Sequence, residues 1–198
     1  MIQERLVERG VDPLFVNRWS PRAFDESSIP KAELQRFFEA ARWAPSAYNA
    51  QPWRFVYARR DTPHWEIFLA LLGQYNRDWA RRASALVIVL SARDFVLPGQ
   101  GKVIDTGYQS FDTGAAVACF SLQASMAGWH SHIIAGLDKE RTKEALGIPE
   151  GYTVEVAIAV GRQGDAQILP PTLQQREAPS GRNPLASLMA EGRFAFRD

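Results

Sequence analysis

The sequence contains one cysteine, Cys119, and no surplus of either charge. With a single thiol an intramolecular disulfide is impossible, and this cysteine usage fits the reducing cytoplasm. Cys119 lies in an apolar run without a neighbouring base or cation, which is typical of a packed thiol and not of a catalytic one. Lys and Arg number 23 against 22 for Asp and Glu, so the chain lacks the positive excess with which general nucleic-acid-binding proteins neutralise phosphates.

Long hydrophobic runs are also missing. The longest apolar stretch, Leu86 to Leu90, is far shorter than the ~20 residues that a membrane-spanning helix requires. The segment from Met1 to Gly10 is rich in charge and lacks the apolar centre of a secretory signal. We therefore expect a soluble, cytoplasmic protein with one domain over residues 1–198, because a chain of this length buries enough surface to fold without a metal or a disulfide.

Hydrophobic periodicity predicts helices and strands in alternation. The lengths of chain between strands are irregular, which favours an α+β fold over a regular doubly wound one. The expected helices are a short one around Ile2, Leu6 and Val7, one that follows Pro30, one from Trp65 that closes at Gly73, and one capped by Asp138 that ends at Gly147. The expected strands are Arg54 to Tyr57, Ala85 to Leu90, Trp129 to Ile134 and Val154 to Val160.

Three other segments point beyond a simple monomer. Residues Thr113 to Ala127 are apolar almost all round, which predicts a helix buried on every side, and a partner subunit is one natural way to cover it. Residues Gln163 to Asp198 are rich in proline and poor in core residues, so we expect this tail to wrap over the partner. Residues Phe95 to Asp105 are expected to form a functional loop that contains glycine and proline.

Three polar segments carry the candidate binding residues. Arg18 to Arg22 places two guanidiniums around a hydroxyl, a combination that binds phosphate, although a solvated surface loop has the same composition. Ala44 to Trp53 holds two prolines and several amide or hydroxyl side chains, which fits a rigid binding loop or a capped turn. In Ser180 to Leu185 an Asn-Pro pair can begin a helix whose positive end, beside Arg182, favours an anion, and an ordinary capped helix is the alternative.

The order and spacing of these motifs resemble the nitroreductase family of FMN enzymes along nearly the whole chain. The motifs are Arg18-x-Ser20-x-Arg22, the run Ala-Pro-Ser-x-x-Asn-x-Gln-Pro-Trp from Ala44, and Gly181-Arg182-x-Pro-Leu. The second motif is the most specific of the three. The resemblance implies a three-layer α-β-α sandwich of the α+β class and an obligate homodimer, with FMN between the subunits and an exchanged C-terminal arm.

The same resemblance implies which residues bind the cofactor. Arg18, Ser20 and Arg182 are expected to hold the phosphate and ribityl chain, and Arg22 to lie near N1 and C2=O of the flavin, where a cation stabilises the reduced form. Ser180 stands where many relatives have lysine, so one cation fewer is expected at the phosphate. The complete set of expected FMN-binding residues is Arg18, Trp19, Ser20, Arg22, Pro45, Ser46, Asn49, Asn76, Ala135, Gly136 and Arg182, of which Pro45, Ser46 and Asn49 come from the partner and Ala135 and Gly136 meet the flavin edge near N5 and O4.

The activity implied is the transfer of hydride from NADH or NADPH, through flavin N5, to a small acceptor such as a nitroaromatic, a quinone or an enone. Donor and acceptor use one site in turn, so a ping-pong mechanism is expected, and no side chain is needed as a nucleophile or an acid–base pair. The Phe95 to Asp105 loop, with Tyr108 and Phe111, is expected to set acceptor specificity. Two alternatives remain: a relative that consumes its reduced flavin with oxygen to make a cobalamin-ligand precursor, and a non-enzymatic flavin-binding or sensory protein.

Other site types have less support in the sequence. His130 and His132 share one strand face, but a zinc site needs at least three protein ligands and the partners are missing. Gly99 to Lys102 lacks the first glycine and the following Ser or Thr of a phosphate loop. No Gly-x-Gly-x-x-Gly follows a strand, so a dinucleotide-binding Rossmann domain is not indicated.

Overall fold

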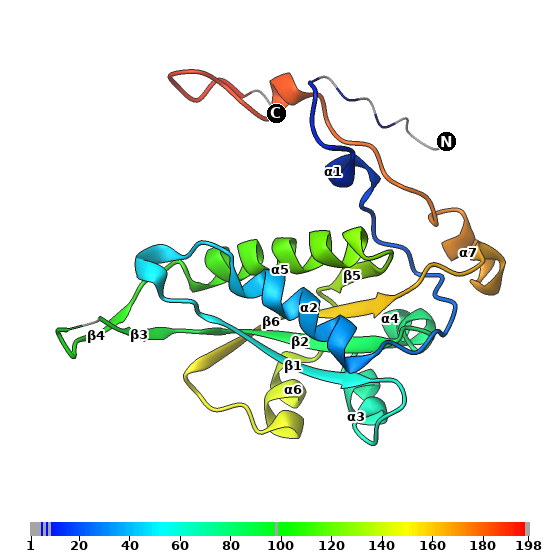
Figure 1. Ribbon diagram of the computed structural model, residues 1–198, viewed down its shortest axis with the longest axis horizontal. Coiled ribbons are helices and arrows are strands. Elements are labelled where there is room, and N and C mark those ends of the chain that lie inside the picture. The colour runs from blue at the N-terminus through cyan, green and yellow to red at the C-terminus, as the bar shows by residue number, and fades with distance from the viewer. Residues whose placement is uncertain (1–4, 6, 8, 98, 197–198) are drawn as a thin grey trace.

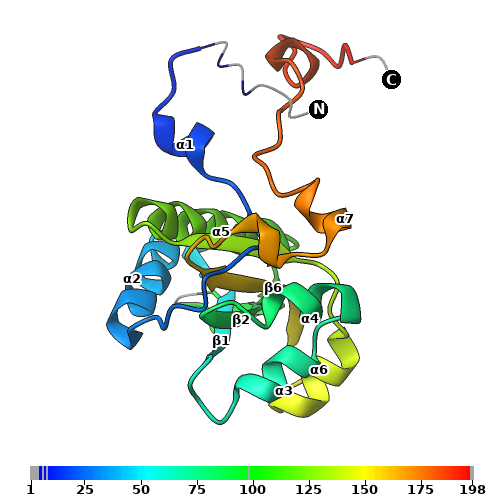
Figure 2. The ribbon, with the colours of Figure 1, turned by 90° about the vertical axis from the view of Figure 1, so that its right-hand side faces the viewer.

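A four-stranded antiparallel sheet is the centre of the fold. The computed structural model describes residues 5, 7, 9–97 and 99–196. The strand order is β1 (Trp53–Arg59), β2 (Ala85–Ala92), β6 (Tyr152–Gly161) and β5 (His130–Ile134). Helices cover both faces of the sheet, which gives three layers (Figures 1 and 2). The α+β class and the layered arrangement expected from the sequence are confirmed, as are all four predicted strands.

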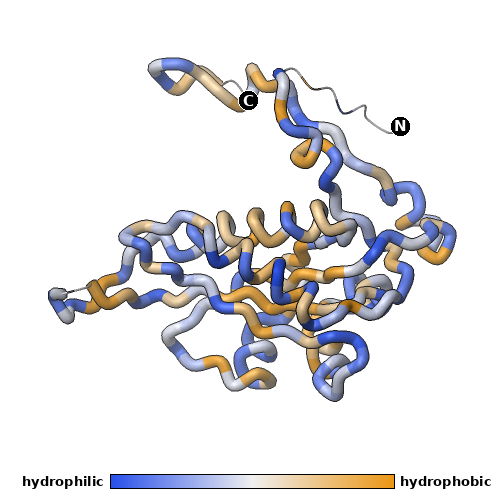
Figure 3. The backbone as a smooth tube through the Cα atoms, viewed as in Figure 1, coloured by the Kyte–Doolittle hydropathy of each residue, from blue (hydrophilic) through white to orange (hydrophobic). Residues whose placement is uncertain are grey.

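One face of the sheet packs against α2 (Lys31–Arg42) and α5 (Gln109–Met126). The opposite face packs against α3 (Trp65–Ala70), α4 (Gln74–Ala80) and α6 (Lys139–Leu146). Successive residues of β2 face opposite sides, so Val87 and Val89 enter the first core while Leu86 and Ile88 enter the second. Because both faces are covered, β2 is apolar without interruption from Ala85 to Leu90, and the sheet is correspondingly orange in Figure 3.

Local capping explains where several helices begin and end. Asp138 accepts a hydrogen bond from the amide of Arg141 at 3.0 Å and begins α6, and Gly147 ends it in the left-handed region at φ 63°. Helix α1 (Pro13–Asn17) begins at Asp12, which accepts from the amide of Leu14 at 2.8 Å. The predicted opening helix lies mostly outside the described residues, since Ile2 and Leu6 are not described, and Val7 is not helical.

Two predicted boundaries are wrong. The helix predicted from Trp65 ends at Ala70 and not at Gly73, which is instead the N-cap residue of a further helix, α4. Residues Phe95 to Asp105 are not an irregular loop: β3 (Asp94–Val96) and β4 (Val103–Asp105) pair as a hairpin. Each of these strands has three residues, which is too short for an alternating pattern to be recognised in the sequence.

Helix α5 is buried on one side only, so the prediction of burial all round is wrong for a single chain. Its buried residues are Asp112, Thr113, Ala116, Val117, Phe120, Ser121 and Ala124. On the other side Phe111 is 79% exposed and Met126 67% exposed, and Gly114 and Ala118 are also exposed. Cover by a partner subunit stays a prediction.

The segment with α1 and the segment after residue 175 both extend away from the sandwich, on the same side of it (Figures 1 and 2). The C-terminal segment passes through η2 (Ala166–Ile168), α7 (Pro171–Gln174) and η3 (Leu185–Ser187). Leu169 and Leu173 anchor its first part in the core, and Arg5 donates from Nε to the carbonyl of Ser180 at 3.1 Å. No helix in the described part of the chain is both long and apolar enough to cross a bilayer.

The arginine-rich segment is tied to the end of β6. Phe24 forms a β-bridge with Gln163, the amide of Gly164 donates to the carbonyl of Ala23 at 2.8 Å, and the amide of Asp25 donates to Arg162 at 3.1 Å. The ring of Phe24 is fully buried and lies directly over Gly161. A Cβ atom at Gly161 would lie 2.5 Å from Cδ1 of Phe24, so only glycine permits this approach.

Replacement of this glycine tests the attachment. Gly161→Ala is expected to lower the free energy of unfolding by about 1–3 kcal/mol, because the buried Phe24 ring has no room to move aside. Urea unfolding followed by circular dichroism measures the effect. Gly151→Ala is the matched control: its Cβ would meet nothing within 4 Å, so its effect should stay below about 1 kcal/mol. Equal losses in the two variants would contradict the close approach at Gly161.

Candidate active site

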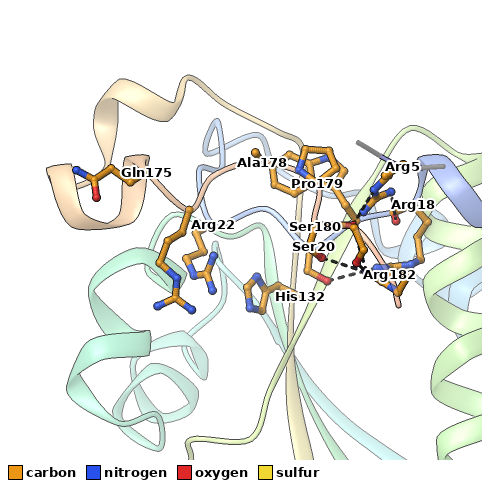
Figure 4. Close-up of a pocket in the computed structure, with 13 residues that line it drawn as sticks. Arg5, Arg18, Ser20, Arg22, His132, Gln175, Ala178, Pro179, Ser180 and Arg182 are labelled. Carbon is orange, nitrogen blue, oxygen red and sulfur yellow. Dashed lines mark hydrogen bonds between the residues drawn. The ribbon is translucent and has the colours of Figure 1, made fainter. Parts of the chain in front are cut away.

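A cavity of about 560 Å³ lies between the two ends of the chain and the edge of the sheet. Three parts of the sequence contribute to it: the N-terminal segment, strand β5 and the segment after α7. Figure 4 shows the side chains that converge there. The lining residues are Arg5, Arg18, Trp19, Ser20, Arg22, His132, Gln175, Arg176, Ala178, Pro179, Ser180, Gly181 and Arg182.

The cavity is strongly basic. Five of its lining residues are arginines, and no aspartate or glutamate lines it. Arg18 donates to Ser20 Oγ at 3.3 Å and Arg182 donates to Ser180 Oγ at 3.1 Å. The ion pairs among the described residues involve none of these arginines. The cluster therefore has guanidinium groups and hydroxyls facing one space without a counter-charge.

Mutual repulsion is visible in the arginine pKa values. Burial lowers the pKa of Arg18, and the charge of Arg182 lowers it further. The pKa of Arg5 is lowered by burial and by repulsion from Arg182 and Arg18. Arg5 and Arg18 nevertheless remain charged at neutral pH, because the ordinary pKa of a guanidinium lies far above neutrality. Each cation destabilises the charged form of its neighbours. An anion placed among them would offset both this repulsion and the energetic cost of desolvating the guanidiniums.

The sequence predicted Arg18, Trp19, Ser20, Arg22 and Arg182 to lie together, and all five line this cavity. Trp19 itself is buried and packs edge-on against His130, with ring centroids 6.3 Å apart, so it anchors the segment. The helix expected after the Asn-Pro pair is only the single turn η3. It is too short to supply the helix-end charge proposed for an anion, and the guanidiniums supply that charge instead.

Arg5 is a member of the cluster that sequence reasoning missed. Its Nη1 donates to the carbonyls of Val16 and of Arg18, the latter at 3.2 Å, and its Nε donates to Ser180. These bonds link the N-terminal segment to the C-terminal one beside the cavity. Arg5 belongs to no recognisable motif, and the contact depends on the meeting of the chain ends, so no local signal identifies it.

The sequence offers His132 only as a candidate metal ligand. Among the described residues no group of three or more His, Cys, Asp or Glu side chains is arranged to hold a metal ion. The imidazole donates from Nδ1 to the carbonyl of Pro21 at 2.9 Å and packs on Trp79, with centroids 4.6 Å apart. Burial, together with the charges of Arg22 and Arg18, lowers the pKa of His132 to about 4, although the bonds to the backbone act in the opposite direction. The ring is therefore neutral at pH 7.

A second cavity, of about 430 Å³, contains Asn76 and Gly136. Asn76 donates from Nδ2 to the carbonyl of Gly136 at 3.3 Å, and a Cβ at Gly136 would lie 2.6 Å from that nitrogen. Ala135 is exposed beside it. Arg176, from the first cavity, donates to the hydroxyl of Tyr75, from the second, at 3.3 Å. The two cavities are therefore neighbours along one side of the molecule.

Neither cavity is lined by Pro45, Ser46 or Asn49. Figure 1 shows their segment, in cyan, at the other end of α5 from the arginine-rich segment. The amide of Ala47 donates to the buried Asp112 at 3.0 Å, and the amide of Gln51 donates to Ser46 Oγ at 3.0 Å. These three predicted residues are brought together with one another, but not with the cluster of the same chain.

The backbone of this segment is strained. Tyr48, Asn49 and Gln51 have φ values of 55°, 54° and 48°, a region that costs non-glycine residues energy unless the surroundings enforce it. The bonds to Asp112 and Ser46 provide that enforcement. The segment contains the single turn η1 (Ala47–Asn49) held by these hydrogen bonds, so its geometry fits both interpretations of the sequence, a binding loop and a capped turn.

Comparison with known proteins gives the family context. The sequence matches the profile of the Nitroreductase family over residues 16–72 and 60–162. It is 26% identical over 174 residues to a protein of Thermus thermophilus named NADH dehydrogenase, with 74% of this chain and 83% of that protein covered. It is also 26% identical over 193 residues to the CLA biosynthesis enone reductase of Lactiplantibacillus plantarum, with 80% and 88% covered.

The fold has counterparts among solved structures. A crystal structure described as an oxidoreductase containing FMN superimposes with a TM-score of 0.94 and 45% sequence identity, over 100% of both chains. A nitroreductase family protein from Streptococcus pneumoniae TIGR4 superimposes with a TM-score of 0.71 at 20% identity, over 90% of this chain and 98% of that one. The second likeness concerns the fold alone.

The depressed pKa of His132 predicts a pH dependence of stability. An unfolded histidine titrates near 6.5 and the folded one near 4, so the unfolded state binds more protons between these values and stability falls as the pH drops from 6.5 to 4. His132 alone accounts for a loss of about 3 kcal/mol over this window. Urea unfolding of the wild type and of His132→Asn at pH 7 and pH 4 measures it. The variant, whose amide still donates to Pro21, should lose less; parallel losses would contradict a neutral, buried His132.

Proposed function

This chain belongs to the nitroreductase family, and we propose that it is an FMN-dependent oxidoreductase that uses NADH or NADPH to reduce a small acceptor. The observation that carries the proposal is the cluster of Arg5, Arg18 and Arg182, which has no carboxylate among the residues that line the cavity. A dianionic phosphate matches this set of donors. The counterpart at 45% identity over its whole length, described as containing FMN, supports the same cofactor.

The donor set fits a phosphomonoester. Guanidiniums donate two parallel hydrogen bonds to phosphate oxygens, and the hydroxyls of Ser20 and Ser180 lie within 3.3 Å of Arg18 and Arg182 respectively. Ser180 replaces the cation that many relatives have at that position, and Arg5 offers a guanidinium from the N-terminal segment instead. The expected shortage of one cation is thereby compensated.

We place the flavin ring in the direction of the second cavity. Arg22 and His132 line the space next to the cluster, and Asn76 and Gly136 line the neighbouring space beyond the Arg176–Tyr75 contact. Residue 136 must be glycine, because a Cβ atom there would collide with the side chain of Asn76. Without a side chain at this position, the backbone beside Ala135 is open to a planar ligand. Asn76, Ala135 and Gly136 are accordingly proposed as contacts of the ring.

When bound, FMN supplies the two-electron chemistry that links a nicotinamide to an acceptor. The chain contributes position and charge. The cation of Arg22 favours negative charge on a neighbouring ring. The imidazole of His132 is neutral at pH 7, so it contributes no charge to the site. Donor and acceptor are expected to occupy the same open face in turn, so no nucleophile or acid–base pair among the side chains is required.

We further propose a homodimer in which each chain completes the site of the other. Beyond its first turn the open face of α5 is lined by Gly114, Ala118 and Met126, a surface of small and apolar residues of the kind that subunit interfaces bury. The rigid loop with Pro45, Ser46 and Asn49 lies at one end of this helix. Pairing through α5 brings that loop to a partner, where it can cover the flavin.

The acceptor proposed is a planar electrophile: a nitroaromatic, a quinone or an enone. Tyr108 and Phe111 are exposed at the start of α5, beside the β3–β4 hairpin, and aromatic side chains stack on flat π-systems. The relative named an enone reductase supports the class.

Loss of single arginines tests the phosphate site. Arg18→Ala and Arg182→Ala should each raise the Kd for FMN at least tenfold, because a hydrogen bond to a charged group contributes about 1.5–3 kcal/mol. Quenching of flavin fluorescence on titration measures the Kd. Riboflavin, which lacks the phosphate, should bind all variants equally. Arg36→Ala, which removes an exposed arginine paired with Glu33 at 3.1 Å, is the control and should bind FMN normally.

Steady-state kinetics test the reaction. With NADH or NADPH and a quinone varied together, double-reciprocal plots should give parallel lines, as one site used in turn requires. Anaerobic addition of nicotinamide should bleach the absorption of the bound flavin. Intersecting lines, or a flavin that neither nicotinamide reduces, would count against an oxidoreductase of this type.

A further inference from the structure

Glu177 makes an unusual connection behind the basic cavity. Its Oε1 accepts hydrogen bonds from the backbone amides of Arg22, at 2.7 Å, and of Ala23, at 2.8 Å. The two partners lie 155 and 154 residues away in the sequence. One carboxylate oxygen therefore joins the C-terminal segment to the arginine-rich segment, with bonds strengthened by its charge.

No other hydrogen bond is present for these two amides among the described residues. Pro21 and Ala23 are buried on either side of Arg22, so water is a poor substitute at this point of the chain. Without the carboxylate the segment would leave two adjacent amide donors unsatisfied. The geometry of the Arg18 to Arg22 segment thus depends on Glu177.

The carboxylate is itself held in place by the core. Leu169 and Leu173 are buried among the residues of the second core, and the amide of Glu177 donates to Gln174 at 3.1 Å as the chain leaves α7. On the other side, the bonds of Ala23 and Asp25 to the end of β6 fix the arginine-rich segment. The segment is clamped between β6 and Glu177.

Glu177 also keeps its charge out of the cavity. Its sequence neighbours Arg176 and Ala178 line the cavity, but Glu177 does not. It forms no ion pair within 4.0 Å with Arg22 or with the other described arginines. Its second oxygen, Oε2, and Nε of Arg22 are both buried without a hydrogen-bond partner. The carboxylate therefore binds backbone and leaves the guanidiniums free for an anion.

We propose that Glu177 is a positioning residue of the anion site: its carboxylate holds the backbone of Arg22 and Ala23, and so aligns Arg18 to Arg22 with Ser180 to Arg182 around one phosphate. The proposal rests on the proposed function for the identity of the ligand, but not for the alignment of the two segments. Figure 4 shows the alignment, with Ser20 and Arg18 facing Ser180 and Arg182 across the cavity.

Two substitutions of Glu177 distinguish the alignment of the two segments from the effect of the carboxylate charge. Glu177→Ala removes both hydrogen bonds, and should raise the Kd for FMN tenfold or more while riboflavin affinity changes less than threefold. Glu177→Gln retains an acceptor oxygen for both amides, and should recover most of the lost affinity for FMN. Glu144→Gln, on the exposed side of α6, is the control for the same change in net charge. Fluorescence titration measures both ligands, and circular dichroism confirms that each variant is folded.

Inorganic phosphate is the second probe, read as the rise in thermal midpoint that it produces. Glu177→Ala should lose this rise and Glu177→Gln should keep it. If the wild type responds to phosphate but does not bind FMN, the proposed function fails and the role of Glu177 is still decided by the phosphate response. Wild-type FMN affinity in Glu177→Ala, equal losses of FMN and riboflavin, no recovery in Glu177→Gln, or no phosphate response in any protein would overturn the inference.

Discussion

The convergence of arginines from the two ends of the chain is the constraint on which the rest of the site depends. Arg18 lies before the first strand and Arg182 beyond the last one, yet burial and the charge of Arg182 both lower the pKa of Arg18. Like charges stay close together only if other contacts enforce the arrangement. Here the sandwich provides the enforcement: β6 holds one segment, the buried leucines of α7 hold the other, and a carboxylate joins the two from behind.

The sheet and its helices position the residues that line the two cavities. Strand β5 ends close to the second cavity, so Ala135 and Gly136 follow it directly, while His132 on the same strand faces the basic cavity. The glycines at positions 136 and 161 are required because a neighbouring side chain, Asn76 or Phe24, occupies the place of a Cβ. Close packing at these points holds the side chain of Asn76 and the arginine-rich segment beside the two cavities.

Sequence reasoning predicted the elements whose pattern is local. Strand β2 is an apolar run rich in β-branched residues, β6 carries a β-branched residue at every second position from Val154 to Val160, and α6 has a cap at each end, so all three were predicted correctly. The β3–β4 hairpin and α4 were missed because each is short and its stability comes from neighbours. Within the site, Arg18, Ser20, Arg22 and Arg182 were found through their motifs, whereas Arg5, His132 and Glu177 act through contacts between distant segments that no local pattern encodes.

The order in which the site is completed during synthesis follows from its construction. The sheet and both hydrophobic cores use residues up to Leu173 and none of the residues after it among those described. Ser180 and Arg182 emerge later, and only then does the basic cavity acquire its second wall. An anion that needs both walls can bind only after residues 180–182 have docked, whereas the two cores form without those residues.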